Sequence, residues 1–194
     1  MPVDASWSLS ERPGFLRLRS LPAPDLFGAR NTLTQRAIGP ESEPTAMLDP
    51  SGMKPGDVAG LGLLNLPYAW IGVRREDEGL VLEHLNQLTG ETKREPFRGP
   101  RVWLRAHCDF LTEKARFSYS TDGERFTPFG GEFVLIFQLK TFQGVRYSLF
   151  HYNERGAPGG FGRLRPLHGE RAASAGPDEA DTFRPDRLRT STAT

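Results

Sequence analysis

The chain has 194 residues, of which 37% are hydrophobic and 25% charged, and this is enough for one domain with a packed core. Its formal net charge of +1 gives no electrostatic reason to expect nucleic acid or an anionic membrane as a partner. The one cysteine, Cys108, excludes an intrachain disulfide and leaves the redox compartment undetermined.

No targeting signal is expected at the N-terminus, which has neither a basic start nor an apolar core. The most apolar stretch, residues 58–73, is interrupted by Gly60, Gly62, Asn65 and Pro67, and this is unlike a membrane span. The default expectation is therefore a cytoplasmic protein that binds no membrane.

Short extended runs follow one another along the chain, separated by turns rich in Gly and Pro. In chain order, the predicted strands cover residues 15–19, 33–38, 45–49, 57–66, 68–76, 80–85, 92–95, 101–109, 116–120, 124–129, 133–139 and 145–152. No segment has the apolar stripe of an amphipathic helix. The pattern predicts an all-β fold, an antiparallel two-sheet sandwich of jelly-roll type.

The strongest local signal lies in residues 116–129. Phe117 and Tyr119 alternate with serines, and Asp122-Gly123 separates this run from a second one. Since Gly accepts a positive φ, an Asp-Gly pair between two extended runs predicts a hairpin with a tight turn.

The composition changes at Arg163, after which Arg, Pro, Ala, Asp, Glu and Thr dominate. We therefore expect the sandwich domain to cover residues 1–162 and a disordered tail to cover residues 163–194. Pro166 supports this boundary, because proline is unsuited to the interior of a strand.

Six segments resemble one protein family and occur in its order. They are WSLSERPGFLRLRS (Trp7 to Ser20), ARNTLTQRAIGP (Ala29 to Pro40), SGMKPGDVAGLGLL (Ser51 to Leu64), YAWIGV (Tyr68 to Val73), FSYSTDG (Phe117 to Gly123) and FQGVRYSLFHYN (Phe142 to Asn153). Together they resemble the C-terminal concanavalin-A-like domain of family 43 glycoside hydrolases, the β-xylosidases and α-L-arabinofuranosidases, over residues 7–161.

The resemblance implies a division of labour. In that family an N-terminal five-bladed β-propeller carries three catalytic carboxylates and performs inverting hydrolysis, while the sandwich packs against it and helps to shape the substrate pocket. Nothing in this chain resembles the propeller, so no catalytic residue can be carried over. The implied partners are a glycosidase propeller, in cis in relatives and in trans here, and plant-polysaccharide oligosaccharides.

The end of the match departs from the family pattern. Gly159-Gly160-Phe161 is followed by an arginine-rich segment in place of the Asp- and Phe-rich final strand of the family. This favours a truncated or detached module that has lost its closing strand, with marginal stability or self-association through the open sheet edge.

His107, Cys108 and Asp109 form the one cluster that suggests nucleophilic catalysis. On a strand Cys108 points away from both neighbours, whereas a cysteine nucleophile needs its base within hydrogen-bond reach. We expect a buried structural thiol.

Two carboxylate clusters could suggest a glycosidase active site, which needs a pair of carboxyl groups across the scissile bond. They are Glu41 with Glu43, and Glu76 with Asp77 and Glu78. Both lie in charged loops, so a solvated surface is the expected explanation and no catalytic centre is predicted.

No metal or other cofactor is predicted. The four histidines, His84, His107, His151 and His168, are scattered, and no Asp- or Asn-rich calcium loop is present. A structural calcium ion is compatible with the fold class but has no sequence signal.

Aromatic residues are the candidate binding groups, because an aromatic ring can cover the apolar face of a sugar. Period two places Tyr68 and Trp70 on one face of a strand, and Ile71 and Val73 on the opposite, core-facing side. Tyr68 and Trp70 are therefore candidates for carbohydrate binding or a domain interface, with simple packing as the alternative.

Three further aromatic residues are assigned by position. Phe126 and Phe129 follow the predicted hairpin turn and could belong to a loop presented to a neighbour, either a sugar or a domain. Trp103 alternates with Val102 and Leu104 and is assigned to the core.

The sequence thus favours a non-catalytic accessory β-sandwich of a family 43 glycosidase acting on xylan or arabinan oligosaccharides. Two alternatives stay open. One is an independent carbohydrate-binding module that uses exposed aromatic residues, and the other is a degenerate fragment without function.

Overall fold

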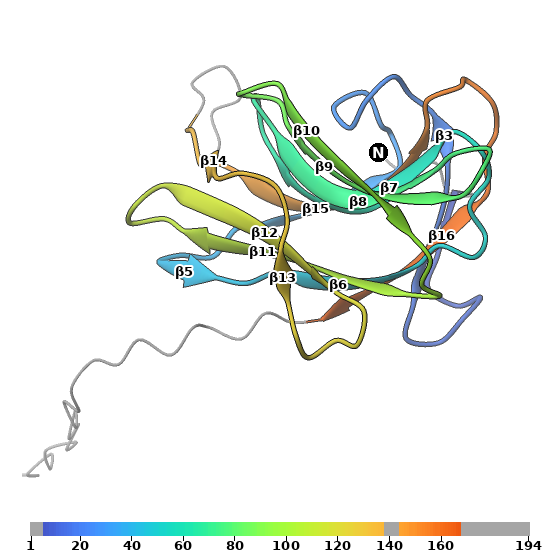
Figure 1. Ribbon diagram of the computed structural model, residues 1–194, viewed down its shortest axis with the longest axis horizontal. Coiled ribbons are helices and arrows are strands. Elements are labelled where there is room, and N and C mark those ends of the chain that lie inside the picture. The colour runs from blue at the N-terminus through green and yellow to red at the C-terminus, as the bar shows by residue number, and fades with distance from the viewer. Residues whose placement is uncertain (1–5, 138–143, 168–194) are drawn as a thin grey trace, which may run out of the picture.

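The computed structural model describes residues 6–137 and 144–167. These residues form two β-sheets packed face to face and contain no α-helix (Figure 1). This part of the chain accordingly has no helix that could span a membrane. The predicted fold class, an antiparallel two-sheet sandwich of concanavalin-A-like type, is confirmed.

One sheet has nine strands, and its main path runs β1-β2-β16-β6-β11-β12-β13, with β5 beside β11 and β14 beside β12. Its members are β1 (Trp7–Ser8), β2 (Leu16–Arg19), β5 (Glu41–Ser42), β6 (Thr45–Asp49), β11 (Val102–Asp109), β12 (Lys114–Ser120), β13 (Thr127–Pro128), β14 (Phe133–Val134) and β16 (Phe161–Leu167).

The other sheet has seven strands in the order β10-β9-β8-β7-β15-β3, and β4 lies beside β15. Its members are β3 (Leu21–Pro22), β4 (Thr32–Arg36), β7 (Asp57–Leu64), β8 (Ala69–Arg75), β9 (Leu80–Asn86), β10 (Glu91–Phe97) and β15 (Arg146–Asn153). All pairs are antiparallel except β3 with β15. The predicted hairpin of residues 57–66 and 68–76 is confirmed as β7 and β8.

The main hydrophobic core fills the space between the sheets. Leu48, Leu104 and Phe117 reach it from the nine-stranded sheet, and Ile71 and Val73 reach it from the seven-stranded sheet. The alternation of buried and half-buried residues along β11 shows why a period of two fits this strand, since it turns one face toward the core.

The connection at Asp122-Gly123 differs from the predicted tight turn. β12 and β13 pair at Ser118–Pro128 and Tyr119–Thr127, so residues 121–126 form a longer loop. Side chains organise this loop: the Asp122 carboxylate accepts the backbone N–H of Glu124 and Arg125 at 2.8 and 2.9 Å.

Hydrogen bonds from the Arg125 backbone and the Ser120 hydroxyl lower the pKa of Asp122 to about 2. Gly123 has a φ of 84°, and a Cβ there would lie 2.9 Å from Cε2 of Trp103. The sequence signal therefore marks a turn correctly but not its length.

The chain ends its described part in a strand that was not predicted. β16 lies between β2 and β6 and pairs with both, so the expectations of a lost closing strand and of a tail beginning at residue 163 are wrong for residues 163–167. Pairing with β2 stops at Leu164, and Pro166 therefore lies where the strand has one neighbour, a position at which proline is tolerated. The rest of the predicted tail lies outside the described residues.

Asp57 lies at the centre of a buried polar cluster that joins both sheets. Its carboxylate is fully buried and accepts hydrogen bonds from groups far apart in the sequence. The donors are Ser20 Oγ (2.7 Å), Asn153 Nδ2 (2.9 Å), Lys54 N (2.8 Å) and Gly160 N (2.8 Å), and His151 Nε2 lies 3.4 Å away. Burial alone would raise the pKa of Asp57, but His151 and the other donors hold it well below its ordinary value.

We predict that Asp57→Ala lowers the free energy of unfolding by about 3–5 kcal/mol, because it leaves buried donors without their partner. Asp57→Asn keeps one acceptor oxygen and should cost less. A carboxylate whose pKa is lowered in the folded state stabilises the folded protein at a pH above its pKa in the unfolded state, about 3.9. This contribution is lost as the pH falls through the pKa of the folded state. Urea unfolding followed by fluorescence should show a smaller acid-induced loss in Asp57→Asn than in wild type. An equal loss would contradict the assignment.

His84 is a buried titratable group without polar partners. It is fully buried in β9, its ring centroid lies 5.1 Å from that of Phe117, and neither ring nitrogen has a hydrogen-bond partner. Burial lowers the pKa of His84, while nearby Glu91 opposes and Lys93 reinforces the shift. The folded state therefore favours the neutral imidazole.

We predict that His84→Leu flattens the dependence of stability on pH between pH 7 and 5. A histidine whose folded-state pKa is lowered stabilises fully above its unfolded pKa of about 6.5 and destabilises as the pH falls below it, by up to about 1.4 kcal/mol per pH unit. Urea midpoints measured across this range test the expectation. A variant with the wild-type slope would show that His84 does not titrate on unfolding.

Candidate functional site

Tyr68 and Trp70 lie on the face predicted for them, but that face is closed. The outer side of the seven-stranded sheet carries a second apolar cluster, in which Trp70 is 1% and Tyr68 4% exposed. Residues 23–29, part of the blue N-terminal segment above this sheet in Figure 1, cover them through Ala23, Leu26 and Ala29. The expectation that these two aromatic residues are open to a sugar or a domain is therefore wrong for this structure.

The aromatic rings of the covered cluster contact one another. Trp70 packs edge-on against Phe150 with ring centroids 5.6 Å apart, and Phe150 stacks on Tyr152 at 5.9 Å. Burial, together with the charge of Asp25 and its hydrogen bond to the phenol, raises the pKa of Tyr68 to about 12. Asp25 thus anchors the covering segment to the aromatic face.

Phe126 and Phe129 have different environments. Phe126 is half-buried, and the Arg105 guanidinium lies 3.6 Å from the centroid of its ring. Phe129 is 1% exposed and packs edge-on against Tyr119 in the main core. An interface or sugar-binding role is therefore compatible with Phe126, while the expectation that Phe129 is presented to a neighbour is wrong.

Trp103 was assigned to the core, and this is also wrong. Val102, Leu104, Ala106 and Cys108 face inward along β11, so Trp103 lies half-buried on the outer side of the sheet beneath Gly123. The outer face of the nine-stranded sheet thus presents Trp103 and Phe126, the two predicted aromatic positions that retain access to solvent.

Cys108 is the buried structural thiol that its strand position predicts. It is fully buried, and burial raises the pKa of its thiol to about 12, although a hydrogen bond with Tyr147 opposes the rise. His107 points to the other side, where its Nδ1 lies 3.1 Å from Oε1 of Glu43. The arrangement cannot supply a thiolate nucleophile.

Ser20, Asp57 and His151 are a serine, an aspartate and a histidine brought together by the fold. The Ser20 hydroxyl bonds to the Asp57 carboxylate, whereas a serine nucleophile needs a histidine to accept its proton. Asp57 and His151 are fully buried and Ser20 is 4% exposed. This cluster stabilises the fold and offers no access to substrate.

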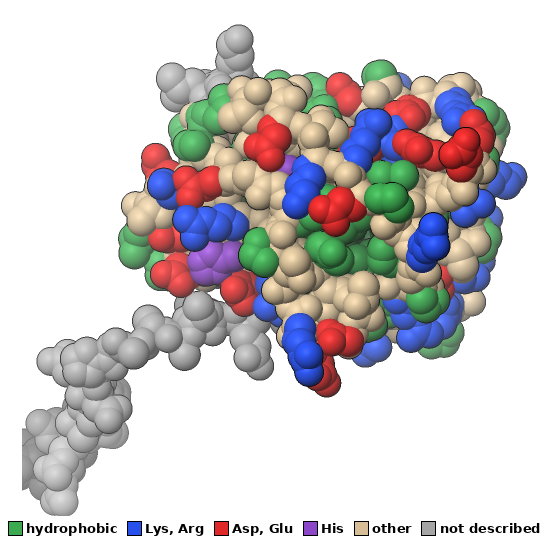
Figure 2. Space-filling view, in the orientation of Figure 1, with side chains coloured by type: hydrophobic (Ala, Val, Ile, Leu, Met, Phe, Trp, Pro, Cys, Tyr) green, Lys and Arg blue, Asp and Glu red, His purple; other side chains and the backbone are tan. Residues whose placement is uncertain are grey.

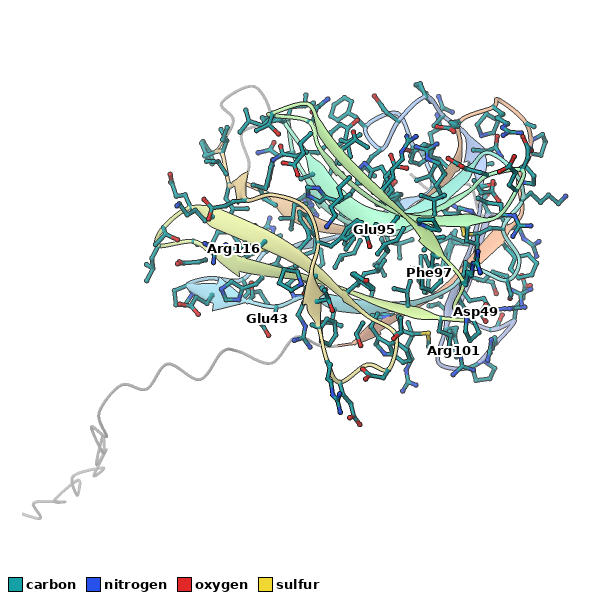
Figure 3. All side chains as sticks on the ribbon, in the orientation of Figure 1. Glu43, Asp49, Glu95, Phe97, Arg101 and Arg116 are labelled. Carbon is teal, nitrogen blue, oxygen red and sulfur yellow. The ribbon has the colours of Figure 1, made fainter. Side chains whose placement is uncertain are left out.

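One member of each carboxylate cluster forms a surface ion pair. Glu43, labelled in Figure 3, lies 3.7 Å from the Arg105 guanidinium as well as beside His107. Asp77 receives two hydrogen bonds from Arg155, at 2.8 and 2.9 Å. The described residues contain no group of three or more His, Cys, Asp or Glu that could hold a metal ion. The expectation that no cofactor is bound stays a prediction, and His168 lies outside these residues.

An open groove of about 630 Å³ lies between β4 of the seven-stranded sheet and β6 and β16 of the other. Its walls are mainly apolar, and Leu33, Ala46, Leu61, Leu149 and Pro166 contribute to them. Sequence reasoning missed this groove because its walls come from β2, β4, β5, β6, β7, β15 and β16, which only the folded topology brings together. Hydrophobic side chains are also visible between the sheets on the side shown in Figure 2. Phe97, labelled in Figure 3, points from β10 into the core.

Residues 1–161 match the family described as the beta xylosidase C-terminal concanavalin A-like domain. The chain belongs to this family. The resemblance expected from the six segments is thereby confirmed, and the match ends where β16 begins.

The relatives named below are much longer than this chain. A β-xylosidase of Formosa agariphila is 32% identical, and the match covers 79% of this chain and 29% of the relative. A bifunctional GH43-CE protein of Bacteroides eggerthii has 33% identity and a TM-score of 0.82, with 87% of this chain and 22% of the other covered. A family 43 hydrolase engineered to act as both endo-xylanase and exo-arabinofuranosidase has 27% identity and a TM-score of 0.77, with 87% and 36% covered. The chain therefore spans about a quarter to a third of these relatives.

We predict that Cys108 does not react with a thiol reagent such as dithionitrobenzoate in the folded protein, because its thiol is buried and held protonated. One thiol per chain should react once urea unfolds the protein. The absorbance of the released thiolate measures both states, and rapid reaction without denaturant would contradict the buried position.

Proposed function

We propose that this chain is the non-catalytic β-sandwich companion of a family 43 glycosidase propeller that hydrolyses oligosaccharides derived from xylan or arabinan. The observation that carries the proposal is the family match over the sandwich, in a chain that spans only 22–36% of the relatives named above. The family resemblance assigns the catalytic carboxylates to the propeller, which this chain does not resemble.

The environments of the candidate catalytic residues support a non-catalytic role. The one cysteine is buried, the Ser-His-Asp cluster is sealed inside the core, and Glu43 and Asp77 are ion-paired on the surface. We assign xylan- and arabinan-derived substrates to the propeller because the relatives include a β-xylosidase and a hydrolase with endo-xylanase and exo-arabinofuranosidase activity. Phe126, with Arg105 stacked on it, is the aromatic position that we assign to contact with a neighbouring domain.

The companion role is tested by a chimera in which this chain replaces the matching C-terminal part of the Formosa agariphila β-xylosidase. Removing that part should lower kcat on the order of a hundredfold, because a pocket that loses one wall misplaces its substrate. We predict that the chimera recovers most of this loss. A folded chimera no more active than the truncated enzyme would overturn the proposal.

The isolated chain should not turn over aryl β-xylosides or aryl α-L-arabinofuranosides. A measurable rate that one carboxylate substitution, such as Glu43→Gln, abolishes would reveal a catalytic centre on this chain. Calorimetric titration with xylo-oligosaccharides distinguishes the companion role from an independent carbohydrate-binding module. Saturable binding lost in Phe126→Ala would favour an independent carbohydrate-binding module over the companion role.

A further inference from the structure

The edges of the two sheets differ in how well they are protected from pairing with another chain. Unpaired strand edges attract further strands unless they are short, charged or interrupted by proline. In the described part of the chain, β1, β3, β5, β13 and β14 have two residues each and are too short to template a partner.

β10 is a long edge but a guarded one. Its seven residues are mostly exposed, and they include several charges and a proline: Glu91, Lys93, Arg94, Glu95 and Pro96. The half-open end of β16 carries Pro166 in the same way.

β4 lacks this protection. It has five residues, Thr-Leu-Thr-Gln-Arg, with one charge and no proline, and its side chains are half-buried or exposed. Within the described residues it pairs only with β15, and no described strand pairs with its other edge. The edge also borders the apolar groove, where Leu9 and Ile38 are 61% and 50% exposed. A bare edge beside an apolar groove is a surface that a further strand would cover.

We propose that two copies of this chain pair through β4, antiparallel and with the two-fold axis at Thr34, to form one continuous sheet. This inference goes beyond the companion role and does not depend on it. The interface is isologous, because each copy contributes the same strand.

The register follows from charge and from the side-chain faces. Centring the pair on Thr34 places Thr34 opposite Thr34, Leu33 opposite Gln35, and Thr32 opposite Arg36 of the second copy. All five residues of β4 then pair, and no two like charges face each other. Centring the pair on Leu33 would set Arg36 opposite Arg30 of the second copy. Placing the two-fold axis midway between two residues would turn the groove of one copy to the other side of the sheet.

The groove supplies the apolar contribution. A two-fold axis normal to the sheet keeps the inner faces of both copies on one side, so Leu33 and the groove walls of one copy continue into those of the other. Backbone hydrogen bonds along the edge provide the pairing, and the removal of Leu9 and Ile38 from water adds to it.

Light scattering of the eluting protein over a dilution series tests the dimer. Wild type should be dimeric. Thr34→Glu sets two carboxylates opposite each other and should weaken the dimer on the order of tenfold, while the matched neutral variant Thr34→Gln should stay dimeric. A monomeric wild type, or dimers unaffected by Thr34→Glu, would overturn the proposal.

Disulfide trapping tests the register directly, because the native Cys108 is buried and does not compete. In Thr34→Cys the paired Cα atoms should lie about 4.5–5.5 Å apart, within disulfide range, and mild oxidation should give a covalent dimer. In the control Arg36→Cys the two sulfur-bearing residues lie about 14 Å apart along the strands and should not link. Equal trapping at both positions would overturn the register.

Circular dichroism confirms that each variant folds. Thr34→Glu introduced into the chimera should retain glycosidase activity, and this result separates the dimer proposal from the companion role.

Discussion

The buried carboxylate of Asp57 is the constraint on which the rest of the sandwich depends. Its oxygens bind the end of the β2 region through Ser20, the end of β15 through Asn153, and the approach to β16 through Gly160. A buried charge is tolerated only when its partners are all in place, so these segments must assemble together. Gly160 directly precedes β16, which lies between β2 and β6 although its sequence is poor in strand-forming residues.

The period of two placed most of the strand residues considered on the correct face, but Trp103 was assigned to the core although it alternates with the inward-facing Val102 and Leu104. The period of two in β11 places Cys108 inward, and along residues 68–73 it separates Tyr68 and Trp70 from Ile71 and Val73. It could not show what lies above a face, because the cover over Trp70 comes from residues 23–29, remote in the sequence. β16 was missed for a related reason. Proline disfavours a strand position that has a neighbouring strand on both sides, and the sequence does not show how many neighbours each position has.

Residues that often perform catalysis have structural roles in this domain. Ser20, Asp57 and His151 are close together, yet the hydroxyl bonds to the carboxylate and the cluster is sealed from solvent. Cys108 is held protonated by burial, and Glu43 is engaged by Arg105 and His107. The reactivity of a side chain is therefore set by its partners and its access to solvent.

The covering segment over the seven-stranded sheet has a consequence for the diversity of such domains. Trp70, Phe150 and Tyr152 form a row of aromatic rings that is closed by one short connection, not by the sheet itself. Shortening or displacing residues 23–29 would open a ready-made aromatic trough without changing a single strand. A sandwich of this kind can pass between a sealed scaffold and a ligand-binding surface by changing one loop, which evolves more freely than the core.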